Sequence, residues 1–528
     1  MALSQSLDTQ AGFAPSGPAR PFGSILFPDR IAEVSAFAEP AFFSDLNLDR
    51  AVDAITAGAQ EYELKPFFHA PPRSTEAVEY RHQVFRDLER DEVRAPVRAF
   101  AEAMQRTRRY LALVEKQRYP YEKERWFLDA ALLYSAAVSS LAEALVSLEL
   151  SSEGLRGLRD RVAGYSSSGN FRSLSSQAAL VRDGLAQVRY SVKIKGLRVT
   201  VSRYGGEPDY SVEVEHDFER FRQGDVENHR FDLRDPGSMD HVEAQIVERV
   251  ALLFPDAFRA LEEFYSAHQD FLDPTLVRFD REVQFYLVYL AFIERLGKAG
   301  LGFTYPEVSG DSKEVSAEDA FDIALANKLT IEGSGVVRND FFLSDSERIL
   351  VVTGPNQGGK TTFARMFGQL HYLASLGLPV PARAARLFLT DRLFTHFERE
   401  EDIATLRGKL DDDLVRVRET LEAATPDSII LLNEIFSSTT LHDAKILSAD
   451  VLARIIELGS LGVCVTFIDE LTELGDETVS MVARVAPDDP AKRTFEIVRR
   501  PADGKAYAWA IAEKYGLTHD TLKRRVAR

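Results

Sequence analysis

The stretch Val351–Phe363 constrains the fold more than any other part of this sequence. It reads VVTGPNQGGKTTF, an apolar run followed by a glycine-rich turn and then by residues with helical spacing. From Gly354 to Thr361 it fits the Walker A pattern, in which glycines allow backbone N–H groups to surround phosphate oxygens. The helix after such a turn directs the positive end of its dipole at the anion. The stretch therefore predicts a strand, a phosphate-binding loop and a helix.

Individual residues of this loop have separate expected roles. We expect Lys360 to reach the β- and γ-phosphates of ATP and the Thr361 hydroxyl to bind Mg²⁺. A chance glycine turn is the alternative, and the preceding strand, the lysine and the hydroxyl together argue against it. The residues predicted to bind the nucleotide are Gly354, Pro355, Asn356, Gln357, Gly358, Gly359, Lys360, Thr361 and Thr362.

A second apolar run, Ser428–Leu432, ends in Asn433-Glu434, where a Walker B strand presents its metal and water-orienting groups. Glu434 is the candidate for orienting the attacking water, with Lys360 as the second catalytic residue. Asn433 is expected beside Thr361 at the metal, but its amide carries no negative charge, which predicts weak metal binding or slow turnover. The alternative is that Glu434 is a solvated carboxylate, and the hydroxyl cluster Ser437–Thr440 beside it disfavours this.

The segment Tyr190–Ser202 alternates apolar and polar residues about Lys195-Gly196, which predicts a two-stranded β-ribbon. Tyr210–Val214 has the pattern of a further strand. The ribbon is basic, since no acidic residue occurs between positions 184 and 206. Contact with nucleic-acid phosphates is one interpretation and simple exposure of a short sheet is the other, and the sequence favours neither. The residues predicted to bind nucleic acid are Lys193, Lys195, Arg198 and Arg203.

Charge and cysteine content limit the partners and the compartment. The formal net charge of −18 over 528 residues repels nucleic acid overall, so any nucleic-acid contact has to be local. The single cysteine, Cys464, excludes a disulfide framework within the chain and suits a reducing cytoplasm. The longest nearly uncharged apolar run, Phe285–Ile293, is too short to span a membrane, so we expect a cytoplasmic protein.

These motifs together resemble the ATPase domain of the MutS family of DNA mismatch-repair proteins. Gly354–Thr361 resembles the phosphate loop of the family, and Asn433-Glu434-Ile435 resembles its Walker B motif. Further segments that resemble the family in order and spacing are Asp391-Arg392, Phe394-Thr395, Asp402, Gly408, Leu471–Leu474, Lys505–Tyr507 and Thr518–Val526.

The resemblance implies an ABC-type, Mg²⁺-dependent ATPase that forms a homodimer, in which a signature helix of one subunit completes the nucleotide site of the other. The residues implied to face the other subunit's nucleotide are Gly408, Asp411, Asp412 and Asp413. The expected fold class is multidomain, with an all-α core and lever region carrying a small β clamp, followed by an α/β P-loop domain. Within the last domain, the polar and acidic segment Ser309–Asp319 is expected to be a linker or loop. The predicted domains are an extended or disordered N-terminal segment (1–44), the helical core (45–188), the β-ribbon clamp (189–216), the lever helices (217–303) and the ATPase and dimerisation domain (304–528).

Three positions depart from the family pattern. Gly408 stands where the family has its signature serine, Asn433 where it has an aspartate, and Phe467 where it has a histidine that acts as a conformational switch. Each departure predicts altered hydrolysis, and none removes nucleotide binding. About 45 residues precede the helical core, which is too few for the mismatch-recognition and connector domains of the family, so we expect neither.

The expected function is ATP binding and hydrolysis coupled to closure of the clamp on double-stranded DNA that is branched or distorted, in repair or recombination. Such DNA would be recognised by shape rather than by a mispaired base. One alternative is a nucleotide-gated scaffold with weak turnover that binds a protein partner and not DNA. Another is that the same clamp binds RNA or the ribosome.

Overall fold

The computed structural model describes residues 22–28, 37–207, 239–397, 408–486 and 489–502. The chain divides into two compact units. The first consists of Met1–Gly23, Pro96–Glu149 and Gly154–Thr275, and the second consists of Ser24–Ala95, Leu150–Glu153 and Leu276–Arg528. Several segments singled out in the sequence lie outside the described residues, namely Tyr210–Val214, Asp402, Lys505–Tyr507 and Thr518–Val526.

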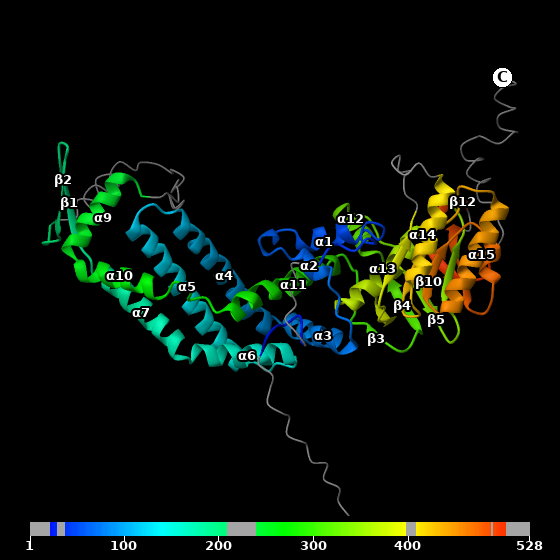
Figure 1. The fold of residues 1–528 in the computed structure, drawn as a ribbon, viewed down its shortest axis with the longest axis horizontal. Coiled ribbons are helices and arrows are strands. Elements are labelled where there is room, and N and C mark those ends of the chain that lie inside the picture. The colour runs from blue at the N-terminus through cyan, green and yellow to red at the C-terminus, as the bar shows by residue number, and fades with distance from the viewer. Residues whose placement is uncertain (1–21, 29–36, 208–238, 398–407, 487–488, 503–528) are drawn as a thin grey trace, which may run out of the picture. The chain divides into compact units, whose positions relative to one another are not determined.

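The first unit is a bundle of helices that carries a β-ribbon at one end (Figure 1). Its central helix, α5, packs against α7 and α10, and Phe127 of α5 makes edge contacts with the rings of Phe264, Tyr265 and Phe271. The helices are α4 (Asp91–Lys116), which begins in the second unit, α5 (Pro120–Val146), α6 (Glu153–Ser166), α7 (Gly169–Ala186), α9 (His241–Leu253) and α10 (Pro255–Ala267).

Helix α5 is long and apolar enough to cross a membrane by length and composition alone, and no other helix of the described residues is. Its most apolar window has a mean hydropathy of 1.3 and is 44% buried inside the protein. Phe127, Tyr134 and Leu141 of this helix are all buried. This is the burial expected of the core helix of a bundle.

The ribbon consists of β1 (Tyr190–Lys195) and β2 (Arg198–Arg203), paired antiparallel as the sequence predicted. The pairs Tyr190–Arg203, Val192–Val201 and Ile194–Val199 lie on one face, because side chains alternate between the faces of a ribbon. The opposite face carries the remaining pairs, which are Ser191–Ser202, Lys193–Thr200 and Lys195–Arg198. The ribbon therefore has an apolar face and a basic, hydroxyl-rich face.

The second unit is built on a six-stranded sheet in the order β12-β11-β6-β10-β9-β8. Every neighbouring pair is parallel except β11 and β12, which agrees with the largely parallel sheet predicted from the sequence. The strands are β6 (Ile349–Thr353), β8 (Leu393–His396), β9 (Ile429–Asn433), β10 (Leu461–Val465), β11 (Thr478–Ala486) and β12 (Asp489–Arg499).

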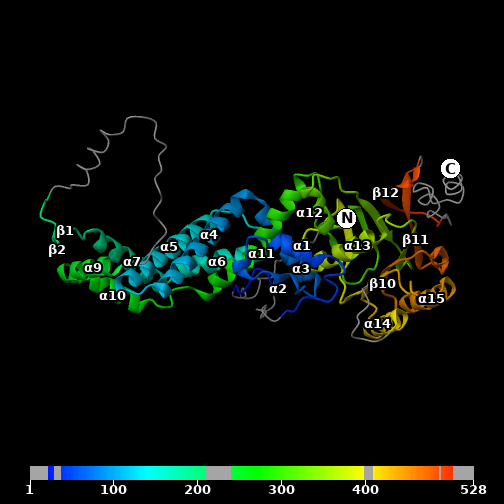
Figure 2. The same ribbon diagram turned by 90° about the horizontal axis from the view of Figure 1, so that it is seen from above.

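Helices cover both faces of this sheet. Helix α13 (Lys360–Ser375) packs on β9 and β10, where Gly368 leaves room for Leu431 and Leu46. On the other face, α14 (Lys409–Ala423) and α15 (Leu441–Leu458) lie side by side over a core that includes Val351, Leu432 and Cys464 (Figure 2). The remaining helices are α1 (Leu48–Thr56), α2 (Lys65–Phe68), α3 (Thr75–Glu89), α11 (Pro274–Gly297) and α12 (Ile323–Ile331), with short 3₁₀ turns η2 (Gln60–Tyr62) and η3 (Asp469–Glu473).

A second sheet of four strands was not predicted. Its order is β3-β7-β4-β5, with β3 (Glu307–Ser309), β4 (Val315–Ala320), β5 (Asn339–Leu343) and β7 (Ala384–Phe388). The expectation that Ser309–Asp319 is a linker is therefore wrong, since most of β4 lies in it. This strand reads VSAEDA and pairs on both sides despite its acidic residues, because Val315, Ala317 and Ala320 are buried while Glu318 is exposed.

Candidate nucleotide-binding site

The phosphate loop joins β6 to α13, and its conformation requires glycine at two positions. Gly354 has φ 114°, and Gly359, which caps the N-terminus of α13, has φ 94°. A Cβ on Gly354 would lie 3.0 Å from Ala483 of the neighbouring strand β11. All five residues of β6 are buried, which holds the start of the loop at the C-terminal edge of the sheet.

Lys360 lies at the centre of the loop and is only 4% exposed. Its Nζ donates to the carbonyl oxygens of Gly354 at 2.9 Å and Pro355 at 3.3 Å. The same Nζ lies 4.1 Å from the centroid of the Phe467 ring, a cation–π distance. Burial lowers the pKa of Lys360 to about 8, while the Glu434 carboxylate raises it and the positive charge of Arg493 lowers it further.

Thr361 and Asn433 are brought together although they are far apart in the sequence. The Thr361 hydroxyl donates to Oδ1 of Asn433 over 2.9 Å, because β9 and β6 both flank β10 and end at the same edge of the sheet. Hydroxyl and amide oxygens are ligand types that Mg²⁺ accepts. A Cβ at Gly358 would lie 2.9 Å from the Pro355 carbonyl oxygen, so the loop is shaped as a cradle that side chains would fill. The donor atoms and the cradle fit a Mg²⁺–nucleotide complex.

Glu434 follows directly on β9 and is half-buried. Its φ of 54° is a left-handed conformation that a non-glycine residue rarely adopts. Phe436 has the same conformation, with a φ of 57°. The backbone N–H of Glu434 donates to the carbonyl oxygen of Val465 at 2.9 Å, which holds this turn against β10. Its influence on the pKa of Lys360 places the carboxylate within electrostatic reach of the loop.

Arg493 is a residue of this site that the sequence did not indicate. It lies on β12, and its Nε donates to the carbonyl oxygen of Asn356 at the tip of the phosphate loop over 3.0 Å. The antiparallel return of β12 along β11 brings it there. No motif signals such a contact, since it depends on how two strands pair more than 130 residues after the loop begins.

The residues implied to face a second subunit lie at the start of α14. Gly408 occupies the N-cap position and Asp411 and Asp412 the first turn, where acidic side chains interact favourably with the helix dipole. Asp413 does not fit that implication, because it is buried and Nε2 of His396 lies 3.0 Å from its Oδ1. Its carboxylate serves the contact between α14 and β8 inside the subunit.

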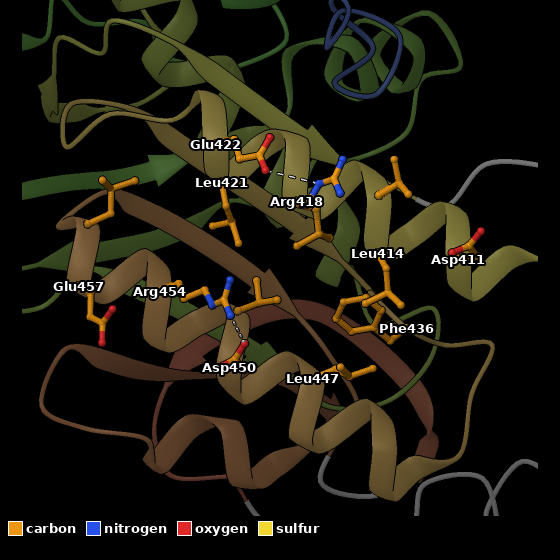
Figure 3. A pocket seen from close by; sticks show the side chains of 14 residues that line it. Asp411, Leu414, Arg418, Leu421, Glu422, Phe436, Leu447, Asp450, Arg454 and Glu457 are labelled. Carbon is orange, nitrogen blue, oxygen red and sulfur yellow. Dashed lines mark ion pairs between the residues drawn. The ribbon is translucent and has the colours of Figure 1, made fainter.

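A groove of about 890 Å³ runs between α14 and α15 and begins beside Asp411 (Figure 3). Its lining is apolar in the middle, where Leu414, Phe436 and Leu447 meet. Its rim is charged, with the ion pair Arg418–Glu422 along α14 and Arg454–Asp450 along α15.

The four basic residues predicted to contact nucleic acid do not share one face of the ribbon. Lys193, Lys195 and Arg198 lie together on the basic face and are exposed. Arg203 lies on the apolar face, where its Nη2 donates to the carbonyl oxygen of Leu253 and its guanidinium stacks 5.0 Å from the Phe254 ring. Arg203 is exposed and also helps to anchor the ribbon at the end of α9, so its contact with nucleic acid stays a prediction.

Comparison with known proteins bears on the second unit. Residues 350–525 match the family model described as MutS domain V. This region of the chain is therefore similar to domain V of the MutS family. Endonuclease MutS2 of Thermus thermophilus is 33% identical over 190 residues, which are 36% of this chain and 25% of the relative. The DNA mismatch repair protein MutS of Shouchella clausii is 29% identical over 228 residues, which are 42% of this chain and 26% of that protein.

DNA mismatch repair protein MutS 2 of Halobacterium salinarum is similar to the same extent, at 31% identity over 195 residues that cover 36% of this chain and 23% of that protein. The chain thus spans about a quarter of the length of the curated MutS relatives it matches. Lys360, Thr361, Asn433 and Glu434 all fall within the matched domain V. The ribbon lies outside it.

Proposed function

We propose that this chain is a Mg²⁺-dependent ATPase of the MutS type that works as a homodimer and uses its ribbon to hold double-stranded DNA. One observation carries the proposal: the hydrogen bond between Thr361 and Asn433 joins a phosphate loop to the end of β9, beside Lys360 and Glu434. This arrangement places a cation, two metal-binding oxygens and a carboxylate around one position at the edge of the sheet.

The residues of the site have separate roles in the proposed hydrolysis. Lys360 leaves the carbonyl oxygens of Gly354 and Pro355 and donates instead to phosphate oxygens, while the N–H groups at the start of α13 bind the same anion. Thr361 and Asn433 hold Mg²⁺, which when bound neutralises charge on the phosphates and orients them for in-line attack. Glu434 orients the attacking water, and its strained turn keeps the carboxylate at this edge.

Dimerisation belongs to the proposal because the N-terminus of α14 carries exposed groups that its own site does not use. Gly408 and Asp411 are exposed, and the apolar groove between α14 and α15 opens beside Asp411. A second chain docked at this end would complete its own nucleotide site with these groups. We place this ATPase in the cytoplasm, since Cys464 is a buried thiol.

The ribbon is the surface that would bind double-stranded DNA. Lys193, Lys195 and Arg198 form an exposed basic face in a protein with a net charge of −18, and the relatives named above are called mismatch-repair proteins or endonucleases. ATP binding would close two such ribbons around the duplex, and branched or distorted duplexes would be preferred because they are more easily deformed. Repair or recombination is the corresponding process.

Nucleotide binding and turnover test the first part. Lys360→Ala should weaken Mg²⁺–ATP binding roughly ten-fold or more, because a charge-assisted contact to phosphate is lost. Glu434→Gln should retain binding and slow turnover on the order of 100-fold. Lys328→Ala on α12, an exposed lysine of the same unit, is the control. Wild-type protein that binds no Mg²⁺–ATP would refute the proposal.

A salt titration of DNA binding in Mg²⁺–ATP tests the second part. Replacing Lys193, Lys195 and Arg198 with alanine should lower the affinity and reduce the slope of log K against log salt by about 2–3. A control triple on the same unit, Arg172→Ala with Arg182→Ala and Arg259→Ala, should leave both nearly unchanged, since these arginines lie on helices of the bundle. An unchanged slope in the ribbon triple contradicts DNA binding by the ribbon.

A nucleotide-gated scaffold is the second candidate function. Two observations favour it, namely the uncharged Asn433 at the metal position and the Phe467 ring that lies over Lys360. In that case ATP would bind and drive dimerisation, but wild-type turnover would match that of Glu434→Gln, and DNA or RNA duplexes would not bind. Steady-state turnover of the two proteins distinguishes the candidates.

A further inference from the structure

The turn at the tip of the ribbon carries an apolar side chain where turns ordinarily carry a polar one. Gly196 and Leu197 form a two-residue turn closed by the pair Lys195–Arg198, and Gly196 has φ 59°. Glycine at the first turn position with φ above zero is the requirement of the type II′ hairpin. The second position accepts many residues, so the hairpin does not need leucine there.

Leu197 does not contribute to a hydrophobic core. Its side chain is 106% exposed relative to an extended reference, the highest exposure among the large apolar residues of the described chain. Ile194 beside it is 73% exposed, and Val192 and Val199 on the same face are each about 40% exposed. Folding therefore gains almost nothing from this leucine, and contiguous exposed apolar side chains mark a surface for interaction.

The charge around the apolar tip favours an anionic occupant of this surface. The apolar tip lies between Lys195 and Arg198, with Lys193 further along the same basic face, and Glu207 is the acidic residue that pairs with Lys193, at 3.7 Å. No acidic residue occurs between positions 184 and 206. An apolar point flanked by cations is complementary to a duplex, in which stacked bases lie between two rows of phosphates.

We propose that Leu197 is a wedge that enters double-stranded DNA between adjacent base pairs, while Lys195 and Arg198 contact the phosphates on either side. This inference rests on the proposed DNA binding and adds the means by which a distorted duplex is selected. Insertion unstacks a base step, so it favours nicks, branch points and flexible pyrimidine–purine steps, where stacking is already weak. An acidic protein surface is the competing occupant, and the test below separates it.

The test uses the full-length protein with Mg²⁺–ATP and two probes, an intact duplex and a nicked duplex with 2-aminopurine beside the nick. Wild-type protein should raise the 2-aminopurine fluorescence, which reports unstacking, and should prefer the nicked duplex. Leu197→Ala should abolish the rise and bind the nicked duplex roughly ten-fold more weakly, with an unchanged salt slope. Leu197→Phe should restore the fluorescence, since phenylalanine also serves as a wedge.

Controls separate the outcomes. Leu180→Ala, which removes a 71% exposed leucine from α7, should behave as wild type. Leu197→Ala should keep the wild-type melting temperature, because the side chain is fully exposed. Wild-type protein that binds both duplexes equally, or a Leu197→Ala variant with unchanged fluorescence and affinity, overturns the wedge but leaves DNA binding intact. Absence of any wild-type DNA binding overturns the proposed function and the wedge together.

Discussion

Lys360 shows how a single residue is tuned by its surroundings. Its ammonium group is charged in water up to pH values near 10, but burial brings its pKa to about 8 in the folded protein. Loop carbonyl oxygens and the Phe467 ring stabilise the charged form only in part. A lysine in this state gains from an approaching phosphate, whose charge favours protonation.

ATP affinity should therefore fall as the pH rises through about 8. Above that pH a growing fraction of Lys360 is neutral, and each bound phosphate must first recruit a proton, which costs up to about ten-fold in affinity per pH unit. Fluorescence titration with a labelled nucleotide between pH 6.5 and 9 measures this. Lys360→Arg, which does not lose its charge, should flatten the profile, and an equally steep decline in that variant would assign the effect to another group.

Arg81 is a second residue whose surroundings define its role, because it forms hydrogen bonds to two segments that are distant in the sequence. Its side chain is fully buried, and it donates from Nε to the Leu26 carbonyl oxygen and from Nη1 to that of Leu376 at the end of α13. Arg81→Met should destabilise the protein by about 3 kcal/mol, because two buried carbonyl oxygens lose their donor. Denaturant unfolding measures the change. Arg86→Met, on the exposed side of the same helix, should cost less than about 1 kcal/mol; equal losses would contradict the bonding role.

At the scale of elements, the contact of α5 with α10 contains a buried acid. Glu124 is 7% exposed, and burial followed by the charge of Glu262 raises its pKa to about 7. The usual pKa of a glutamate carboxyl is 4.5. Between this pH and about pH 7, Glu124 therefore keeps a proton in the folded state that it has already released in the unfolded state. Glu248 and Tyr121 line the same cavity of about 240 Å³.

The stability of the bundle should thus decrease as the pH rises from about 4.5 to 7. Glu124→Gln should remove most of this dependence and be more stable than wild type at pH 8 by about 1–3 kcal/mol. Urea unfolding at pH 5 and pH 8, followed by circular dichroism, gives the comparison. Glu143→Gln, an exposed acid on the same helix, should retain the wild-type dependence. A Glu124→Gln variant that is less stable than wild type at pH 8 would contradict the assigned cause.

At the scale of the whole molecule, the proposed sites each use residues from two chains. Lys360→Ala disables a site from within, and Asp411→Lys should disable the site of the partner. Mixing the two inactive variants should partly restore Mg²⁺–ATP turnover, since mixed dimers contain one site with both wild-type contributions. Steady-state turnover of the mixture, compared with each variant alone, tests this. A mixture as inactive as its components would argue against shared sites.

Sedimentation of the same samples supplies the control. Mg²⁺–ATP should shift wild-type protein toward dimer, and mass action makes the shift depend on protein concentration. Asp412→Lys is a matched change in the same helical turn. If it reproduced the Asp411→Lys effect in full, the loss would reflect the charge of the helix terminus rather than a contact of Asp411.

Local features could be predicted because a few neighbouring residues determine them. The phosphate loop, the turn after β9 and the hairpin at Gly196 depend on glycine conformation, apolar runs and spacing, all of which are visible in the sequence. The meeting of Thr361 with Asn433 was predictable for a related reason, since parallel strands end at a common edge.

The sequence by itself therefore determined that this chain forms a strand, a glycine-rich loop and a helix in succession, and a basic ribbon. Only the tertiary structure decided that Arg493 reaches the loop, that Asp413 bonds to His396 inside the subunit and that Arg203 anchors the ribbon to α9. It also placed Ser24–Ala95 in the unit of the ATPase domain. The physical reason is that these contacts join segments distant in sequence, and their partners follow from strand pairing and side-chain packing rather than from local pattern.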